Sequence, residues 1–276
     1  MIRIFDHDIL NLKHRRIASD FENHDFLFKI GFKQLQERLN FIKRDFQKIL
    51  QIGSRGLHFQ NADMLDSHDF FNATIIAHKE FLPFEENSYD LVISNLDLHN
   101  TNDLPGLLTQ IQRILKPDGL FIASIFGGET LYELRSVFQS VELEQSGGIT
   151  PRIFPFADMQ QMGALMQRAN FNLPVVDNEK IKVSYSHIFK LFQDLRGMGE
   201  NNIIIERKKN FTSRSFFTEV QQVYQNRFSF DDKLDATFEM IFILGWKPHE
   251  SQQKPLRPGS AKHRLADALN TEEGAL

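Results

Sequence analysis

The sequence predicts an α/β fold of the doubly wound kind, in which helices cover both faces of a mostly parallel sheet. Three observations carry this prediction. A short apolar run at 48–52 ends in a tight turn, a continuous run rich in β-branched residues occupies 89–94, and an amphipathic helix at 104–115 leads into another apolar run at 120–126. Strands that alternate with helices in this way are typical of a parallel sheet built from βαβ units.

In chain order, the first element expected is a helical cap over residues 1–47. Its apolar residues, Leu35 and Leu39 among them, recur at roughly helical spacing between Lys, Arg and Gln. The run 48–52 indicates a strand because Gly53-Ser54-Arg55-Gly56 ends it as a turn would. Residues 57–72 are ambiguous, and 74–77 could form another short strand.

The clearest helix, 104–115, carries signals at both ends. Asn102 or Asp103 can cap its first turn, and the Lys-Pro-Asp-Gly sequence at 116–119 stops it. Its apolar residues fall on one face. They are Leu104, Leu107, Leu108, Ile111, Ile114 and Leu115. The further elements expected are helices at 129–142 and 157–169, strands at 174–184 and 238–246, and a poorly ordered tail at 251–276.

Composition excludes several classes of protein. The chain has 276 residues and no cysteine, so it has no disulfides, thiolate-bound metal or cysteine nucleophile. A net charge of −4 gives no general attraction to nucleic acid, and no two histidines have the spacing of metal ligands. No apolar run is long enough for a membrane span. The N-terminus resembles neither a secretory signal nor a transit peptide, so a cytoplasmic location is expected.

Three segments follow predicted strands and mark the expected site. They are 51–56, 78–84 and 94–99, and the last comes directly after the strongest strand. In open α/β sheets, ligands bind beyond the carboxyl ends of the strands. A glycine at such a turn also lets the backbone approach a ligand closely. A G-x-x-G sequence alone is a weak signal, because ordinary turns contain it too.

Segments 80–84, 89–94, 98–99, 102–105 and 114–119 together resemble the class I S-adenosylmethionine (SAM)-dependent methyltransferases of the methyltransferase-11 type. That resemblance implies a Rossmann-like sheet of seven strands, six parallel and one antiparallel, with helices on both faces. The run 238–246 suits the antiparallel strand. On this basis we expect the α/β domain to span 48–250, with lid helices near 129–170.

Four further segments are more specific, namely 4–6, 126–135, 194–200 and 243–251. They resemble the respiratory complex I assembly factor 5 family, and the malonyl-carrier-protein methyltransferases of biotin synthesis are more distant relatives. The resemblance implies a role in the assembly of complex I (NADH:quinone oxidoreductase). It also implies a complex I subunit as the protein partner, peripheral membrane association through that partner, and hydroxylation of an arginine in the subunit.

The sequence departs from the methyltransferase pattern at three points of one pocket. Gln51 stands where the glycine loop usually begins with an acid, Arg55 replaces the middle glycine, and His78 replaces the acid that contacts adenine. A neutral histidine does not supply a fixed carboxylate, and an arginine is penalised where φ is positive. Asp63 is the best remaining candidate for the ribose contact, although it could instead be a solvated acid in a loop. The hypothesis is therefore that SAM binds weakly or not at all.

Site residues can still be proposed from the resemblance. His99 could act as a general base, or it could be a histidine with ordinary hydrogen bonds. Tyr132 and Arg135 could contact substrate from the lid, or could simply lie on a helix surface. The residues expected at the cofactor site are Gly53, Ser54, Gly56, Asp63, Phe81, Leu82, Asn95 and Leu96.

Two other functions remain open at this point. One is an active methyltransferase on a small acid or a carrier-bound substrate, and the other is a non-catalytic assembly protein that kept the fold.

Overall fold

The computed structural model describes residues 3–55, 57–253 and 260. Its sheet has the order β3-β2-β1-β4-β5-β8-β6, and the short strand β7 pairs with β8. β8 is antiparallel to both of its neighbours, so the other six strands of this path run in one direction. This confirms the expected sheet with an antiparallel strand at 238–246. The strands are β1 (Ile49–Ile52), β2 (Ala62–Asp66), β3 (Ile75–Ile76), β4 (Tyr89–Asn95), β5 (Leu115–Phe126), β6 (Asn172–Tyr185), β7 (Ser229–Phe230) and β8 (Lys233–Trp246).

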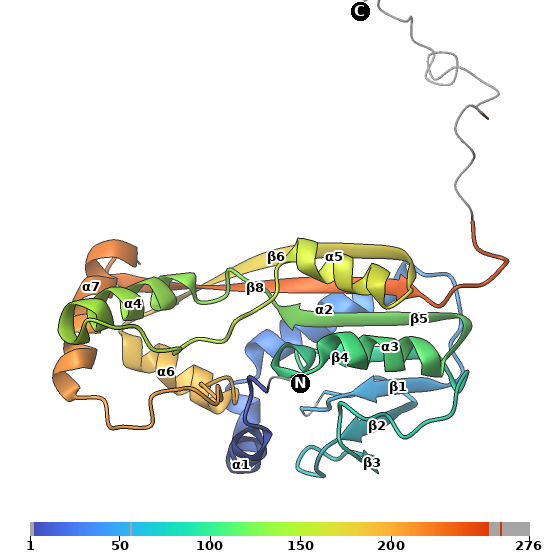
Figure 1. Cartoon of the computed structure of the whole chain (residues 1–276), viewed down its shortest axis with the longest axis horizontal. Helices are drawn as coiled ribbons and strands as arrows, with labels where there is room; N and C mark the ends of the chain where they lie inside the picture. The colour runs from blue at the N-terminus through green and yellow to red at the C-terminus, as the bar shows by residue number, and fades with distance from the viewer. Residues whose placement is uncertain (1–2, 56, 254–259, 261–276) are drawn as a thin grey trace, which may run out of the picture.

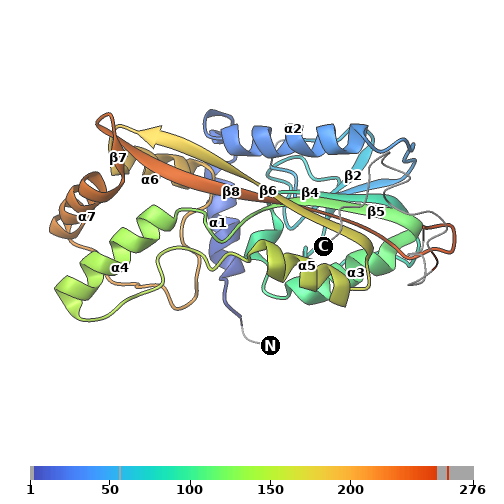
Figure 2. The ribbon, with the colours of Figure 1, turned by 90° about the horizontal axis from the view of Figure 1, so that it is seen from above.

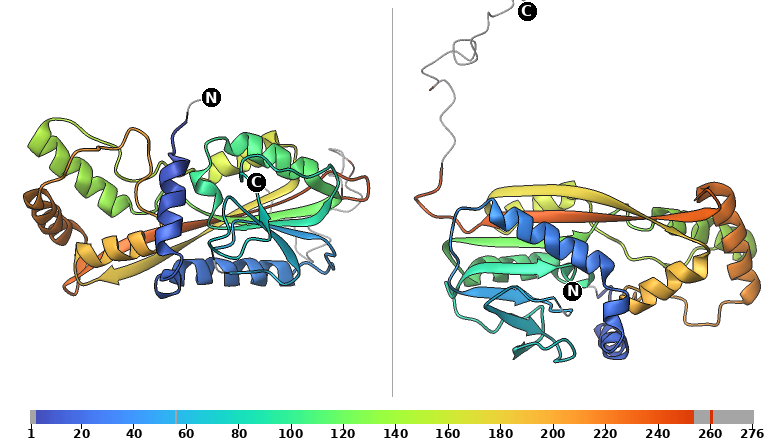
Figure 3. Two further views of the ribbon diagram at one scale, coloured as in Figure 1. Left: turned by 90° about the horizontal axis from the view of Figure 1, so that it is seen from below. Right: turned by 180° about the vertical axis from the view of Figure 1, so that it is seen from behind.

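Helices cover both faces of the sheet, as predicted. α2 crosses one face, and α3 and α5 lie on the other (Figures 2 and 3). Side chains of the central strands alternate between the two cores: Leu91 and Ile93 pack on the α2 side, and Val92 packs on the α3 side. The helices are α1 (His7–Ile17), α2 (Phe26–Asn40), α3 (Leu104–Ile114), α4 (Tyr132–Ser146), α5 (Met159–Arg168), α6 (Ile188–Gly197) and α7 (Arg214–Phe228).

α4, α6 and α7 gather around the far ends of β6 and β8, where the two strands extend beyond the rest of the sheet (Figure 1). α1 lies between this group and the parallel strands (Figures 1 and 2). The bridge between Phe5 and Ile204 joins the chain ahead of α1 to the segment that follows α6. Two short 3-10 turns, η1 (Phe21–Asn23) and η2 (Leu98–Asn100), complete the described elements.

The helix predicted at 104–115 forms as α3, and the residues at its ends explain where it begins and where it stops. Asp103 caps α3, and its carboxylate accepts a hydrogen bond from the backbone N–H of Gly106 at 3.0 Å. Pro105 lies in the first turn, where no helical N–H is required. β5 then begins at Leu115 rather than at residue 120, because Leu115 already pairs with Tyr89 of β4.

Other elements differ from the sequence expectations. The connection from β1 to β2 contains no helix in its described residues, 53–55 and 57–61, although a parallel crossover usually needs a dozen or more residues. α6 and α7 were not predicted. Within the expected lid region near 129–170, α4 packs on α7, whereas α5 packs on the sheet. The predicted tail lies almost wholly outside the described residues. Within the described part of the chain, no helix combines the length and the apolar character needed to span a bilayer.

Candidate functional site

The candidate site lies where β1, β2 and β4 end, the position at which doubly wound sheets bind ligands. Gly53 follows β1 with a φ of +76°, a conformation that glycine adopts without strain. A Cβ added at Gly53 would lie 2.4 Å from Cγ of Asp97, which follows β4. The Asp97 side chain therefore packs directly against the glycine loop.

Arg55 projects from the same loop into the protein rather than into solvent. Only 2% of the residue is exposed, and its backbone φ of +24° is positive. The guanidinium forms an ion pair with Glu200, donates to the carbonyl oxygen of Met198 at 3.3 Å and lies 4.8 Å from the ring centre of Phe28. Its Nη2 is 3.6 Å from the Asp97 carboxylate. Arg55 thus joins the loop after β1 to the segment after α6.

Lys79 extends this arrangement to the ends of β2 and β4. Its ammonium group donates to Asp97 at 2.6 Å and lies 3.8 Å from the carboxylate of Asp66, the last residue of β2. Asp66 in turn accepts a hydrogen bond from the backbone N–H of Ser54 at 3.3 Å. These ion pairs and this hydrogen bond thereby hold together the loop after β1, the end of β2 and the loop after β4.

His99 forms the other side of the cluster. Its Nε2 lies 2.9 Å from a carboxylate oxygen of Glu200, and the rings of Phe126 and Phe156 pack around the imidazole. Its Nδ1 is buried and has no hydrogen-bond partner among the described residues. We refer to Arg55, Asp66, Lys79, Asp97, His99 and Glu200 as the ion cluster.

The charges of the ion cluster stabilise one another. Burial alone would raise the pKa of Glu200, but His99 and Arg55 outweigh it and lower that pKa to about 2. Burial likewise opposes the charged forms of Arg55 and Lys79, yet the neighbouring carboxylates raise the pKa of both. The pKa of Asp97 is lowered, against the effect of burial, by Lys79 and Arg55. Each ion thus offsets the desolvation of its neighbours.

This arrangement does not fit SAM bound in the usual way. The glycine loop of a methyltransferase must leave room for the methionine part of the cofactor, and here Asp97, Lys79 and Arg55 occupy the space before the loop. A neighbouring cavity of about 340 Å³ is open, and its lining includes His68, His78 and Lys79. The space before the glycine loop is therefore filled by charged side chains, whereas the space beside His78 is hollow.

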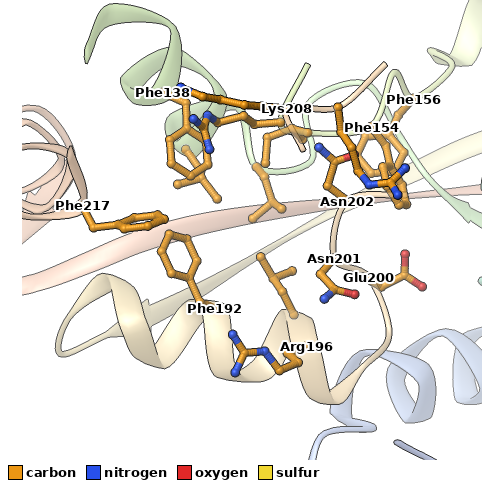
Figure 4. Close-up of a pocket in the computed structure, with 16 residues that line it drawn as sticks. Phe138, Phe154, Phe156, Phe192, Arg196, Glu200, Asn201, Asn202, Lys208 and Phe217 are labelled. Carbon is orange, nitrogen blue, oxygen red and sulfur yellow. The ribbon is translucent and has the colours of Figure 1, made fainter. Parts of the chain in front are cut away.

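A second cavity, of about 300 Å³, opens on the other side of Glu200 (Figure 4). It lies between α4, α6 and α7 and the segments 152–156 and 200–208, and we call it the lid cavity. Figure 4 shows Phe138, Phe192 and Phe217 directed toward one another at one end and Glu200 and Asn201 at the other. Its lining residues are Leu131, Leu134, Phe138, Arg152, Ile153, Phe154, Phe156, Phe192, Leu195, Arg196, Glu200, Asn201, Asn202, Arg207, Lys208 and Phe217.

The structure places the predicted cofactor residues in different settings. Asn95 joins the sheet to α2: its amide donates to the carbonyl oxygen of Phe28 in α2 at 3.0 Å and accepts from Ser124 of β5 at 2.8 Å. Leu96 is buried with a φ of +48°, Leu82 is buried, and Phe81 is 70% exposed. Ser54 is buried beside the ion cluster. Gly56 lies outside the described residues.

The acid at the end of β2 is Asp66 rather than Asp63. Asp63 lies near the start of the strand and accepts a hydrogen bond from the Tyr89 hydroxyl at 3.2 Å. Tyr132 is 40% exposed, outside the lid cavity. Arg135 donates to the carbonyl oxygens of Gly128 and Thr130, both at 3.1 Å. Among the predicted residues, the structure therefore brings Gly53, Ser54 and His99 together and leaves Asp63 apart.

Glu200 and Lys79 were not among the predicted site residues. Glu200 ends the segment 194–200, which carried part of the family resemblance, but nothing local to that segment indicates its contacts with Arg55 and His99. Lys79 lies beside His78 in a segment that was singled out for the adenine contact. For Lys79, the signal in the sequence was a charged residue close to the end of the predicted strand 74–77.

Comparison with known proteins agrees with this geometry. A family model described as a methyltransferase domain matches residues 58–123. Among solved structures, BH2331 from Bacillus halodurans C-125, which has been assigned as a methyltransferase, aligns with a TM-score of 0.51 at 12% sequence identity. That alignment covers 79% of this chain and 99% of the other. The fold and the position of the site define a protein of the methyltransferase fold class.

Sequence relatives narrow the class to one family. The chain is 38% identical to the human mitochondrial arginine-hydroxylase NDUFAF5 over 94% of its own length and 81% of the human protein. It is 43% identical to the Dictyostelium discoideum NDUFAF5 over 68% of this chain, which is 43% of that protein's length. This chain belongs to the NDUFAF5 family, which confirms the family expected from the four specific segments.

A malonyl-[acyl-carrier protein] O-methyltransferase of Methylovorus is a further relative. It is 36% identical over 63% of this chain and 58% of the other protein.

Proposed function

We propose that this protein acts in the assembly of respiratory complex I, where it binds one subunit and takes part in the hydroxylation of an arginine in that subunit. Membership of the NDUFAF5 family across nearly the whole chain is the observation that carries this proposal. The lid cavity supports it, because an open cavity remains beside Glu200 while the position of the SAM methionine is filled.

The roles of individual residues follow from this proposal. The substrate side chain enters the lid cavity and meets Glu200 at its wall. His99 lies behind Glu200, and its Nε2 is within hydrogen-bond distance of that carboxylate at 2.9 Å. In a neutral imidazole that donates through Nε2, the buried Nδ1 is the position from which a base would act. Arg135 supports the chain ahead of α4 rather than the cavity itself, since both of its acceptors are backbone carbonyls.

We further propose that SAM binds weakly or not at all. The missing ribose and adenine contacts would cost on the order of 1–3 kcal/mol each, which corresponds to roughly two to four decades in affinity. Isothermal titration of the purified protein with SAM should therefore give no low-micromolar binding. A low-micromolar dissociation constant would show that the ion cluster opens to admit the cofactor, and it would refute this part of the proposal.

The test of the main proposal is a deletion of the gene in its own host. Assembled complex I, measured on native gels, should fall, and the wild-type gene should restore it. Mass spectrometry of the complex I subunits should show one arginine that loses the mass of an oxygen atom in the deletion strain. Normal complex levels together with unchanged subunit masses would refute the proposal.

The same strains test location and partner. The protein is expected in the cytoplasm, with a fraction held at the membrane through the complex I subunit. Fractionation should lose the membrane-bound portion when that subunit is removed. A membrane-bound portion that persists without the subunit would contradict this route.

A methyltransferase acting on a small acid or a carrier-bound acid is the second candidate. The malonyl-[acyl-carrier protein] O-methyltransferase relative and the cationic residues of the lid cavity favour it. Transfer of a labelled methyl group from SAM to such an acid would support this candidate over the first.

A further inference from the structure

We propose that the lid cavity and the groove beside it bind an extended segment of a partner protein in which acidic residues flank one large apolar side chain. This inference rests on the proposed function, because it names the class of segment that the site accepts. It is carried by the shape of the two hollows, by their charge and by their aromatic lining.

The lid cavity continues into a second hollow of about 480 Å³. Segment 149–156 forms one side of that groove, and Ile4, Ile204 and Glu206 contribute to its lining. The cavity and the groove share Phe138, Arg152, Ile153, Phe154 and Phe156, so the two hollows adjoin, and we call them together the depression. Two adjoining hollows suit an extended chain better than a compact small molecule, which a single cavity would hold.

Positive charge dominates this depression although the whole chain has a net charge of −4. Its two acids are Glu200, which is already paired with Arg55 and His99, and Glu206, which is exposed. Among the described residues, Arg196 and Lys208 have no acidic group within salt-bridge distance. Acidic side chains of a partner would therefore find cations that this chain leaves available. Within the described chain, Arg196 and Lys208 carry the unpaired positive charge, because the other cations of the lining are engaged within this chain. Arg152 is paired with Glu142 at 2.6 Å, Arg207 lies 3.5 Å from Asp6, and Arg135 donates to backbone carbonyls.

Aromatic rings form the apolar part of the lining. The rings of Phe138 and Phe192 are stacked with centres 6.1 Å apart, and Phe217 meets Phe192 at 5.8 Å. Figure 4 shows all three at the end of the cavity away from Glu200. Burial of one large apolar side chain there would strengthen binding, because it removes apolar surface from water. Because these rings line a concave space, they suit an inserted side chain better than a flat lipid surface.

The probe is a short synthetic peptide, labelled with fluorescein, that has Glu residues on both sides of a central Phe. Two matched peptides replace the Glu residues by Lys, or the Phe by Gly. Fluorescence anisotropy with the full chain should show binding of the first peptide that weakens as salt is added. Each matched peptide should bind at least about tenfold more weakly, equivalent to about 1.4 kcal/mol.

Charge-reversal variants locate the binding. The double variant Arg196→Glu, Lys208→Glu should bind the acidic peptide at least about tenfold more weakly than the wild type. Lys43→Glu, Lys182→Glu is the matched control: it makes the same charge change at two exposed lysines, in the loop after α2 and in β6, that have no acidic group within salt-bridge distance among the described residues. The control should stay within about twofold of the wild type, and the melting temperatures of both variants should match the wild type.

Three results would overturn the proposal: equal binding of the Glu and Lys peptides, equal weakening by the two double variants, or binding only to vesicles of phosphatidylglycerol and not to the peptide. The outcome is separable from the proposed function. Normal complex I in the deletion strain, with peptide binding intact, would reject the function and keep the peptide site. Full complementation by Arg196→Glu, Lys208→Glu, with peptide binding unchanged, would reject the peptide site and leave the function standing.

Discussion

The ion cluster and the lid cavity meet at Glu200, but their charged side chains differ in burial and in pairing. In the ion cluster, charged side chains are buried, paired and packed against the glycine loop. Around the lid cavity, Arg196 and Lys208 are exposed, and the space that the aromatic rings line is open. The region on one side of Glu200 is thus closed by the protein's own side chains, and the region on the other side is available to a ligand.

This difference separates charges that stabilise the fold from charges that are open to a ligand. A buried charge is tolerated when its partners are present and is costly when one of them is lost. Side chains of the ion cluster therefore act as structural supports beside the glycine loop. Exposed cations contribute little to stability, so those that line a cavity are free to pair with a ligand. Substitutions in the two regions measure this difference between buried, paired charges and exposed, unpaired ones.

The largest effect is expected for Glu200→Ala. The substitution leaves Arg55 and His99 buried without their shared carboxylate, and the free energy of unfolding should fall by about 3–5 kcal/mol. Urea unfolding followed by circular dichroism measures the loss. The double variant Arg55→Met, Glu200→Met removes both charges and should recover at least half of it. A loss below about 1 kcal/mol for Glu200→Ala would mean that the ion cluster is not a structural support.

Gly53→Ala should have the next largest effect. Residue 53 has a φ of +76°, and the new Cβ would lie 2.4 Å from the Asp97 side chain. Strain of this kind costs of the order of 1–3 kcal/mol, and thermal unfolding should show it. Gly148→Ala is the matched control, because nothing lies within 4 Å of the added Cβ. Equal stability of the two variants would contradict close packing between Asp97 and the glycine loop.

Acid should weaken the ion cluster through protonation of Glu200. Glu200 has a pKa of about 2 in the folded protein against an ordinary value of 4.5. Its contribution to stability is therefore complete above about pH 4.5 and is lost as the pH falls toward 2, with a slope of up to about 1.4 kcal/mol per pH unit for one proton. Urea unfolding at a series of pH values should show a shallower slope for Glu200→Gln. Parallel curves for the variant and the wild type would contradict the lowered pKa.

Much of the fold could be predicted because the evidence for it is local. β4 is a continuous apolar run, and α3 carries its apolar face, its cap and its stop within a dozen residues. α7 was missed because it buries only a narrow stripe, Phe216, Val220 and Tyr224, among polar residues. It packs on α4 rather than on the sheet, so its pattern is not that of a sheet-covering helix.

The site could be predicted only in part, for a different reason. The glycine loop and the position of His99 follow from strand ends, which the sequence marks. The ion pair between Arg55 and Glu200 joins residues that are 145 positions apart, and no local pattern encodes such a contact. Sequence reasoning therefore recognised Arg55 as a departure from the cofactor pattern but did not find the carboxylate that holds it.

The smallest effect on stability is expected for a substitution at the lid cavity. It tests the difference between the ion cluster and the lid cavity most directly. Lys208→Ser removes an exposed cation that has no acidic partner within salt-bridge distance among the described residues. Unfolding free energy should change by no more than about 0.5 kcal/mol, whereas binding of the acidic peptide should weaken. Arg55→Ser, which removes a buried cation, should do the reverse: it should destabilise the protein without a specific loss of peptide binding. If Lys208→Ser destabilised the protein as much as Arg55→Ser, cations would have the same structural role in the ion cluster and at the lid cavity. The proposed difference between the two regions would then be wrong.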